Sequence, residues 1–281
     1  TLPFLFAHQL QQAGITLNYD GDYGVLQRRV KNDEELEHLR AVQKITEATM
    51  EMACSLIARA PADAKGVLQH EGAALTSERV RQLISRFVLD HDCTTLHDSI
   101  VVTVPHVADC HHFGTGPLRK DLPVIVDIFP THNHTHYCGD CTRTVVNGDL
   151  SDIVRDMHAC VVRANAAGCV ALQPGATGQA VHEAVAAVIR DGGYSMGAPT
   201  SEKDEEWIGM RHGTGHGIGL DVHEPILLAT GGGEILEREV FTVEPGLYSA
   251  IHGGVRVEDM VAVTATGHEN FNQLHSELDW R

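Results

Sequence analysis

Residues 33–60 repeat apolar residues at intervals of three and four, which predicts an amphipathic helix. The repeating positions are Leu36, Leu39, Val42, Ile45 and Thr49/Met50. Pro61 cannot continue a helix, so we expect this one to end there. A second helix is predicted to begin at a cap formed by Thr76 or Ser77 and to run to about Asp90.

Stretches rich in β-branched residues follow this helix pair and predict strands. They cover residues 98–107, 122–129 and 137–146. Asn147-Gly148 then forms a turn signal. The first half of the chain is therefore expected to order two helices before a group of strands.

The same order returns in the second half. An Ala- and Val-rich helix is predicted from Ser151 to about Leu172, and a second from about Gly178 to Arg190. Breaks follow them at Pro174-Gly175 and Gly192-Gly193, and strand-like segments come next at 215–223, 239–247 and 254–264. This is a similarity in the order of elements, and it predicts two halves of like architecture.

Residues 1–30 fit neither half. They predict a short helix over 2–13, a strand over 15–19 and a turn at Asp20-Gly21-Asp22. We interpret them as an N-terminal arm or as the remnant of an upstream domain. Residues 31–281 are then one unit.

Composition narrows the classes of protein. Hydrophobic residues make up 43% and charged residues 21%, as in soluble globular proteins. The net charge of −17 argues against a nucleic-acid partner, whose phosphates require a basic face. No apolar run reaches the roughly 18 to 20 residues that cross a bilayer. We therefore expect no nucleic acid and no membrane among the partners.

The seven cysteines have no regular spacing, so a disulfide framework is not expected. Reduced thiols fit a cytoplasmic protein. Cys138 and Cys141 form a CxxC without a second ligand pair. We interpret them as ordinary thiols on a strand, with a structural zinc as the alternative.

Two acidic residues interrupt apolar strands. Asp127 ends the run PVIVD, and Asp140 lies in YCGDCTRTVV. A hairpin would place both carboxylates at one level of neighbouring strands. A single Asp at a strand end is more often a turn cap or an ion-pair partner, but the second Asp and the Thr142-Arg143 that follows it favour a site.

The segment 211–224, RHGTGHGIGLDVHE, holds His212, His216 and His223 among four alternating glycines. On a helix, histidines four apart would suggest a zinc pair. Each glycine costs a helix about 1 kcal/mol, so an extended strand with close backbone approach is favoured instead. A single His is usually structural, whereas three in this setting favour a site.

Glu244 and Glu258 each stand within an apolar run, in VFTVEPGLY and GVRVEDMVAV. Burying an ionised carboxylate requires a cation or strong hydrogen bonds. Arg256 could neutralise only one of the two glutamates, so ion pairs alone leave too many carboxylates.

Four carboxylates and one imidazole form a hard ligand set that suits Mn²⁺, Fe²⁺ or Co²⁺. The five side chains are Asp127, Asp140, His216, Glu244 and Glu258. Five protein ligands are more than one catalytic ion binds while it keeps a coordination position open. Two ions that share carboxylates and a bridging hydroxide explain it, and such pairs stabilise the intermediate of amide hydrolysis.

These motifs, in this order, resemble those of the pita-bread metallopeptidases, the superfamily of prolidase, aminopeptidase P, methionine aminopeptidase and creatinase. The resemblance covers about residues 25–281 and implies an α+β fold with two pseudo-symmetric halves of helices packed on a curved antiparallel sheet. Residues 31–281 would be the catalytic domain. The flanking sequences GLDVHE, TVEPGLY and VRVED are similar to those of the proline-specific branch.

The resemblance also implies roles. Asp127 would bind one ion, His216 and Glu244 mainly the other, and Asp140 and Glu258 would bridge them. Glu244 would in addition move the proton as general base and then acid.

Four further positions take roles on the substrate side. His111 would be the substrate-side histidine, with His112 as the alternative, and His223 would stabilise the intermediate. His212 and Arg256 would line the substrate pocket.

The expected activity is hydrolysis of Xaa-Pro bonds in dipeptides or short peptides by an Xaa-Pro dipeptidase or aminopeptidase. Two divalent ions are the expected cofactors, Mn²⁺ first and Co²⁺, Fe²⁺ or Zn²⁺ as alternatives. A homodimer is the expected assembly if the chain associates. The alternatives are the same metal site acting on a non-peptide amide or as a lyase, and a catalytically inactive binding relative. Only about thirty residues precede the catalytic unit, fewer than in prolidase and aminopeptidase P, whose N-terminal domain often contributes to dimer contacts and limits substrate length.

Overall fold

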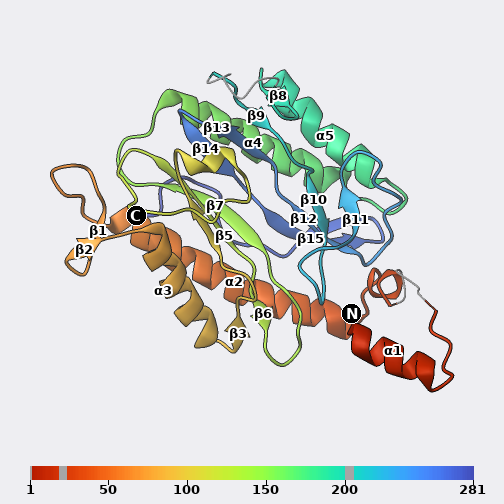
Figure 1. Cartoon of the computed structure of the whole chain (residues 1–281). Coiled ribbons are helices and arrows are strands. Elements are labelled where there is room, and N and C mark those ends of the chain that lie inside the picture. Colours follow the sequence, from red (N-terminus) through yellow and green to blue (C-terminus); the bar gives the residue numbers. More distant parts are fainter. Residues whose placement is uncertain (1, 19–23, 200–205) are drawn as a thin grey trace.

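The strands of the protein lie between two layers of helices (Figure 1). The computed structural model describes residues 2–18, 24–199 and 206–281. One helix layer consists of α2 (Asp33–Arg59) and α3 (Ser77–Leu89), and the other of α4 (Asp152–Ala171) and α5 (Gly178–Asp191). All four of these helices were predicted from the sequence, with ends within two residues.

Side-chain caps set where these helices begin. Asn32 forms a capping box with Glu35 at the start of α2, which satisfies two backbone donors that a helix leaves free. Thr76, Ser151 and Thr177 cap the other three helices in the same way, each through its hydroxyl oxygen. Thr76, and not Ser77, is therefore the N-cap of α3.

The sheet of the first half is antiparallel in the order β4 (Ile100–Val102), β5 (Pro123–Ile128) and β7 (Cys141–Val146). Every residue of these strands is buried because α2 packs on one face of the sheet. Short pairs lie outside it: β1 (Gln69–His70) with β2 (Ala73–Ala74), and β3 (Cys93–Thr94) with β6 (Thr131–His132).

The second half carries two sheets. The larger orders β11 (Glu224–Leu228), β10 (Gly215–Gly217), β12 (Val240–Val243), β15 (Asp259–Thr264) and β16 (Gly267–Asn270). The smaller orders β14 (Gly253–Arg256), β13 (Gly246–Ser249), β9 (Gly209–Met210) and β8 (Ser195–Met196). Helix α4 contacts strands of both, so the helix–helix–strand order of the first half recurs as predicted.

Several predicted strands are shorter or divided in the structure. The segment 98–107 contains only β4 and then the 3₁₀ helix η2 (His106–Ala108). The segments 239–247 and 254–264 each split between the two sheets of the second half, at Glu244-Pro245 and at Val257-Glu258. The strand predicted over 215–223 ends at Gly217. At the two breaks in 239–247 and 254–264, the chain passes from one of these sheets to the other.

The two halves of the protein are joined along one seam. Thr142 of β7 pairs with Glu258, and the Glu258 N–H donates to the Thr142 carbonyl at 3.0 Å. Two residues away, the Thr144 hydroxyl donates to the Arg256 carbonyl at 3.0 Å. The polar residues predicted to form a site lie along this seam.

The N-terminal helix lies at the edge of the molecule, away from the sheets (Figure 1). Helix α1 (Phe4–Gln12) confirms the helix predicted there, and none of its residues is buried. The strand predicted over 15–19 is wrong for residues 15–18, which form no strand, while residue 19 and the turn Asp20-Gly21-Asp22 lie outside the described residues. The 3₁₀ helix η1 (Leu26–Arg28) leads into α2. Within the described ranges no helix has the length and apolar character of a membrane span.

Candidate metal centre

Asp127 is the fifth residue of β5, and its carboxylate is nearly buried. Oδ2 accepts a hydrogen bond from Arg256 Nη2 at 2.6 Å. Oδ1 is buried and has no hydrogen-bond partner. A buried carboxylate oxygen without a donor loses the stabilisation that water would give it, so this atom is free to bind a cation.

Asp140 directly precedes β7 and approaches His216 of β10. Its Oδ2 lies 3.8 Å from His216 Nε2. Gln43 of α2 fixes the Asp140 backbone, donating to its carbonyl at 2.7 Å and accepting from its N–H at 3.0 Å. The register differs from the simple hairpin expected, because Asp127 lies opposite Thr142 and not opposite Asp140.

The glycines around His216 allow close backbone approach, as predicted. A side chain at Gly215 would place its Cβ 1.9 Å from the Thr242 carbonyl oxygen. His216 Nδ1 donates to the Gly217 carbonyl at 3.0 Å, so Nε2 faces the carboxylates as an acceptor. Burial, and then the neighbouring His223, lower the pKa of His216 to about 3. The ring is therefore neutral at pH 7, the form that binds a metal ion.

Glu244 and Glu258 enter the same space from the two bends of the second half. Glu244 follows β12, and its Oε1 lies 3.7 Å from His216 Nε2. Glu258 precedes β15, and its Oε2 accepts from the Thr142 hydroxyl at 2.7 Å. Candidate ligand atoms of Asp140, His216 and Glu258 all lie within 4.8 Å of one another.

The charges of this cluster do not balance. Burial first, and then mutual repulsion among the carboxylates, raise the pKa of Asp140 and of Glu258 well above their usual ranges. Burial likewise raises the pKa of Glu244, to about 8. Arg256 is a buried cation that contacts the cluster, and it pairs with Asp127. The sequence would allow Arg256 to neutralise Glu244 or Glu258, and its ion pair with Asp127 corrects that expectation.

The donor set fits divalent cations. It offers carboxylate oxygens and one imidazole nitrogen, which suit Mn²⁺, Fe²⁺ or Co²⁺, and it includes an unpartnered oxygen on Asp127. Cations would relieve the repulsion that raises the carboxylate pKa values. The residues expected as metal ligands from the sequence are thus brought together by five separate segments.

Arg256 heads a chain of hydrogen bonds that leads away from the cluster. Its Nη1 donates to the Tyr248 hydroxyl at 3.0 Å. The Tyr248 hydroxyl lies 2.7 Å from Nε2 of His212, whose Nδ1 contacts the Gly213 carbonyl. Burial lowers the pKa of His212 to about 3, so its Nε2 accepts from the phenol.

Tyr248 is a residue of the site that the sequence analysis missed. The signal was Gly246, two residues earlier on the same strand, because a Cβ there would lie 2.4 Å from the Tyr248 hydroxyl oxygen. The glycine leaves room for the ring to fold back toward Arg256.

A cavity of about 740 Å³ opens onto the cluster. All five candidate ligands line it, together with His111, His212, His223 and Arg256. His223 lies edge-on to His216, with 4.2 Å between the ring centroids. His112, the alternative to His111, instead stacks on His106 and accepts from the Gly114 N–H, so the geometry favours His111. Apolar walls are supplied by Leu96, Ile100, Phe113, Phe129, Val222 and Leu227.

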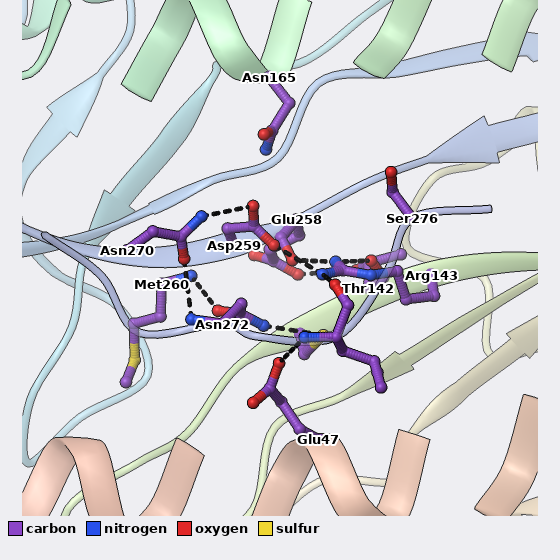
Figure 2. Close-up of polar contacts among 12 residues, drawn as sticks. Glu47, Thr142, Arg143, Asn165, Glu258, Asp259, Met260, Asn270, Asn272 and Ser276 are labelled. Atoms are coloured by element: carbon purple, nitrogen blue, oxygen red, sulfur yellow. Dashed lines mark hydrogen bonds and ion pairs between the residues drawn. The ribbon is translucent and has the colours of Figure 1, made fainter. Parts of the chain in front are cut away.

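A second layer of polar residues supports the cluster from behind (Figure 2). The fully buried Arg143 donates to Asp259 Oδ1 at 2.8 Å and to the Glu258 carbonyl at 2.6 Å. Asn270 donates to the other Asp259 oxygen at 2.9 Å. This layer fixes the backbone from which the Glu258 carboxylate projects.

The cysteines take no part in a disulfide. All seven lie in the described part of the chain, and each is a free thiol, as expected. Cys138 lines the cavity and Cys141 begins β7.

Comparison with known proteins gives consistent matches. Residues 37–265 match the model of metallopeptidase family M24. An uncharacterized peptidase of Staphylococcus haemolyticus is 29% identical over 244 residues, and "Probable dipeptidase PepE" of Mycobacterium tuberculosis is 35% identical over 181 residues. These alignments cover 86% and 64% of this chain, but only 62% and 45% of the relatives.

Solved structures match nearly the whole chain. An X-Pro aminopeptidase from Thermotoga maritima has a TM-score of 0.80 at 26% identity, covering 97% of this chain and 71% of that one. An Xaa-Pro dipeptidase from Bacillus anthracis has a TM-score of 0.81 at 26% identity, covering 99% and 72%.

Proposed function

Because this chain belongs to metallopeptidase family M24, we propose that its buried carboxylate cluster holds two divalent ions and hydrolyses short peptides at Xaa-Pro bonds. The matched structures confirm the predicted pita-bread fold. In this proposal residues 31–281 form the catalytic unit and residues 1–30 an arm. One observation carries it: four carboxylates converge on one cavity, with Arg256 as the guanidinium that neutralises one of them.

The ions would be held by Asp127, Asp140, His216, Glu244 and Glu258. Asp140 and Glu258 contribute to the tight cluster with His216, which supports bridging roles for them. Asp127, with its unpartnered oxygen, supports a place at one end. Bound ions would polarise the scissile carbonyl and lower the pKa of the attacking water. We expect Mn²⁺ first, with Co²⁺, Fe²⁺ or Zn²⁺ as substitutes.

Glu244 is the residue placed to move a proton. Its carboxylate lines the cavity, and burial raises its pKa to about 8. A carboxylate in this place can take a proton from the attacking water and return it to the leaving nitrogen. Bound ions would lower its pKa from the metal-free value. Glu258, by contrast, has one oxygen occupied by the Thr142 hydroxyl and is held in place.

The histidines that line the cavity act on the substrate. His223 stands beside His216 and is accessible from the cavity, so its ring can donate a hydrogen bond to the oxygen that gains charge. His111 also lines the cavity. The hydrogen bonds from Arg256 through Tyr248 to His212 hold the His212 ring in one orientation.

The choice of substrate is supported by the two matched proteins, an X-Pro aminopeptidase and an Xaa-Pro dipeptidase. The apolar walls of the cavity suit the uncharged body of a prolyl peptide.

The test is a hydrolysis panel with metal-depleted and reconstituted protein. Xaa-Pro dipeptides and Xaa-Pro-Xaa tripeptides are compared with the same peptides carrying alanine in place of proline. We expect no turnover without metal, turnover with Mn²⁺, and preference for proline. Hydrolysis of the alanine series at equal rates would remove the proline assignment, and no hydrolysis of either series would remove the peptidase assignment.

A further inference from the structure

We propose that Lys31 and Arg28, in the segment before α2, position the loop that carries His223. The inference rests on the proposed function, because His223 acts on the substrate there. Both cations precede residue 37, where the family match begins. They contact a loop that lies about 190 residues further along the chain.

Glu224 shapes this loop from within. Its side chain is 1% exposed, and Oε1 accepts from the Leu220 N–H at 3.1 Å and the Asp221 N–H at 3.3 Å. The carboxylate also fills the space over Gly219, where a Cβ would lie 2.6 Å from Oε2. The backbone conformation of residues 219–224 therefore depends on where the Glu224 carboxylate lies.

Lys31 fixes that carboxylate. Its Nζ donates to Glu224 Oε2 at 3.1 Å, and the lysine side chain is only 3% exposed. The Lys31 backbone is itself held, because its N–H donates to the Arg238 carbonyl and its carbonyl accepts from the Arg238 side chain. A buried ammonium is costly to desolvate, and Glu224 compensates it.

Arg28 holds the outer side of the same loop. Its Nη2 donates to Asp221 Oδ2 at 2.8 Å, and its Nε lies 3.6 Å from Glu224 Oε1. The loop is tied on its other side by the Cys138 N–H, which donates to the Gly219 carbonyl at 2.8 Å. The loop is therefore held between the N-terminal segment and the segment that leads to Asp140.

The contact between Lys31 and Glu224 restrains His223 through the backbone. Glu224 begins β11, and His223 directly precedes it. The Glu224 side chain contacts Lys31, whereas the His223 side chain lines the cavity, so the two neighbours lie on opposite sides of the chain. Fixing one side chain fixes the direction of the other.

The experiment compares Lys31→Met with Arg29→Met in the Mn²⁺-loaded full chain. Arg29 pairs with the buried Glu239, which lies outside the His223 loop, so Arg29→Met removes a neighbouring ion pair of similar burial. Steady-state kinetics on an Xaa-Pro dipeptide, metal content, and hydrogen exchange of peptides that cover residues 218–224 are measured for both variants.

We expect Lys31→Met to lower kcat about tenfold with a small change in KM, because a displaced group lowers transition-state stabilisation more than binding. Exchange over 218–224 should rise and metal content should stay the same. Arg29→Met should leave kcat and the exchange of this loop near wild type.

Two further variants keep the test decisive if Lys31→Met folds poorly. Lys31→Arg retains the charge and should recover most of kcat. The double variant Lys31→Met/Glu224→Gln should have a higher kcat than Lys31→Met alone. The neutral amide oxygen of glutamine still accepts from the Leu220 and Asp221 N–H groups, and no unpaired charge is buried.

Equal kcat and equal loop exchange in Lys31→Met and Arg29→Met would overturn the proposal. If the wild-type protein cleaves no peptide, the proposed function fails, and the exchange comparison alone then decides whether Lys31 anchors the loop.

Discussion

Arg256 Nη2 lies 2.6 Å from Asp127 Oδ2, which joins residues 129 positions apart in the sequence. The same guanidinium donates to Thr142 and Tyr248. It therefore neutralises one ligand of the candidate centre while it orients the hydroxyl that holds another, Glu258.

Arg256→Met is expected to lower kcat/KM on Xaa-Pro dipeptides roughly a hundredfold, because it removes the contacts to Asp127 and Tyr248 together. Arg256→Lys keeps the charge but not the planar fork, and should recover only part of the loss. Arg40→Met, which removes a guanidinium that pairs with Glu37 and Glu269, serves as the control. Activity of Arg256→Met within about twofold of the control would contradict the role given to this residue.

Glu244→Gln should fold and bind metal but lose about a thousandfold in kcat, the size of effect expected for a general acid–base group. The matched control is Glu47→Gln. Glu47 is also buried, but it lies on α2 outside the cavity, and its Oε1 accepts from the Gln273 and Leu274 N–H groups. Glutamine can still accept there. Loss of activity in both variants, or in neither, would remove Glu244 from the mechanism.

Metal binding is expected to release protons. In the metal-free protein the Glu244 pKa of about 8 means that this carboxyl holds a proton at pH 7, whereas metal ligands must be deprotonated. Burial raises the pKa values of Asp140 and Glu258 as well. As pH rises through about 8, the value for Glu244, fewer protons must leave and the apparent affinity should rise. As pH falls toward about 6, the apparent affinity for metal should fall. Calorimetric titration with Mn²⁺ in buffers of different ionisation enthalpy measures both effects, and a binding heat that does not depend on the buffer would refute the prediction.

Arg143→Met should lower the free energy of unfolding by about 3–5 kcal/mol, since it removes the buried cation that pairs with Asp259 and the donor to Asp259 Oδ1 and to the Glu258 and Leu274 carbonyls. Arg190→Met breaks an ion pair with Glu183 in which both side chains are about half exposed, and should cost under about 1 kcal/mol. Urea unfolding of the two variants gives the comparison. Equal losses would show that the layer behind Glu258 does not stabilise the fold.

The sequence located three of the five candidate ligands because an acidic residue within an apolar run is unusual at any single position. Asp127, Glu244 and Glu258 each stand in such a run. The helices could also be predicted from the sequence, because caps such as Asn32 and Thr76 act within a few residues.

Contacts between residues of different strands and segments could not be predicted from the sequence. The pairing of Arg256 with Asp127 depends on the register between β5, β7 and β14, which no local pattern specifies. The contact of Lys31 with Glu224 depends on how the N-terminal segment meets a loop of the other half. The bends at Glu244 and Glu258 looked like continuous strands because the residues on both sides are apolar.

The seam between Thr142 and Glu258 has a consequence for how the protein can be divided. Asp127 and Asp140 come from one side of it, and His216, Glu244 and Glu258 from the other. Neither half taken alone carries a full set of ligands. Two fragments cut near Asn147-Gly148 would thus each be inert, and peptide hydrolysis would report on their reassembly.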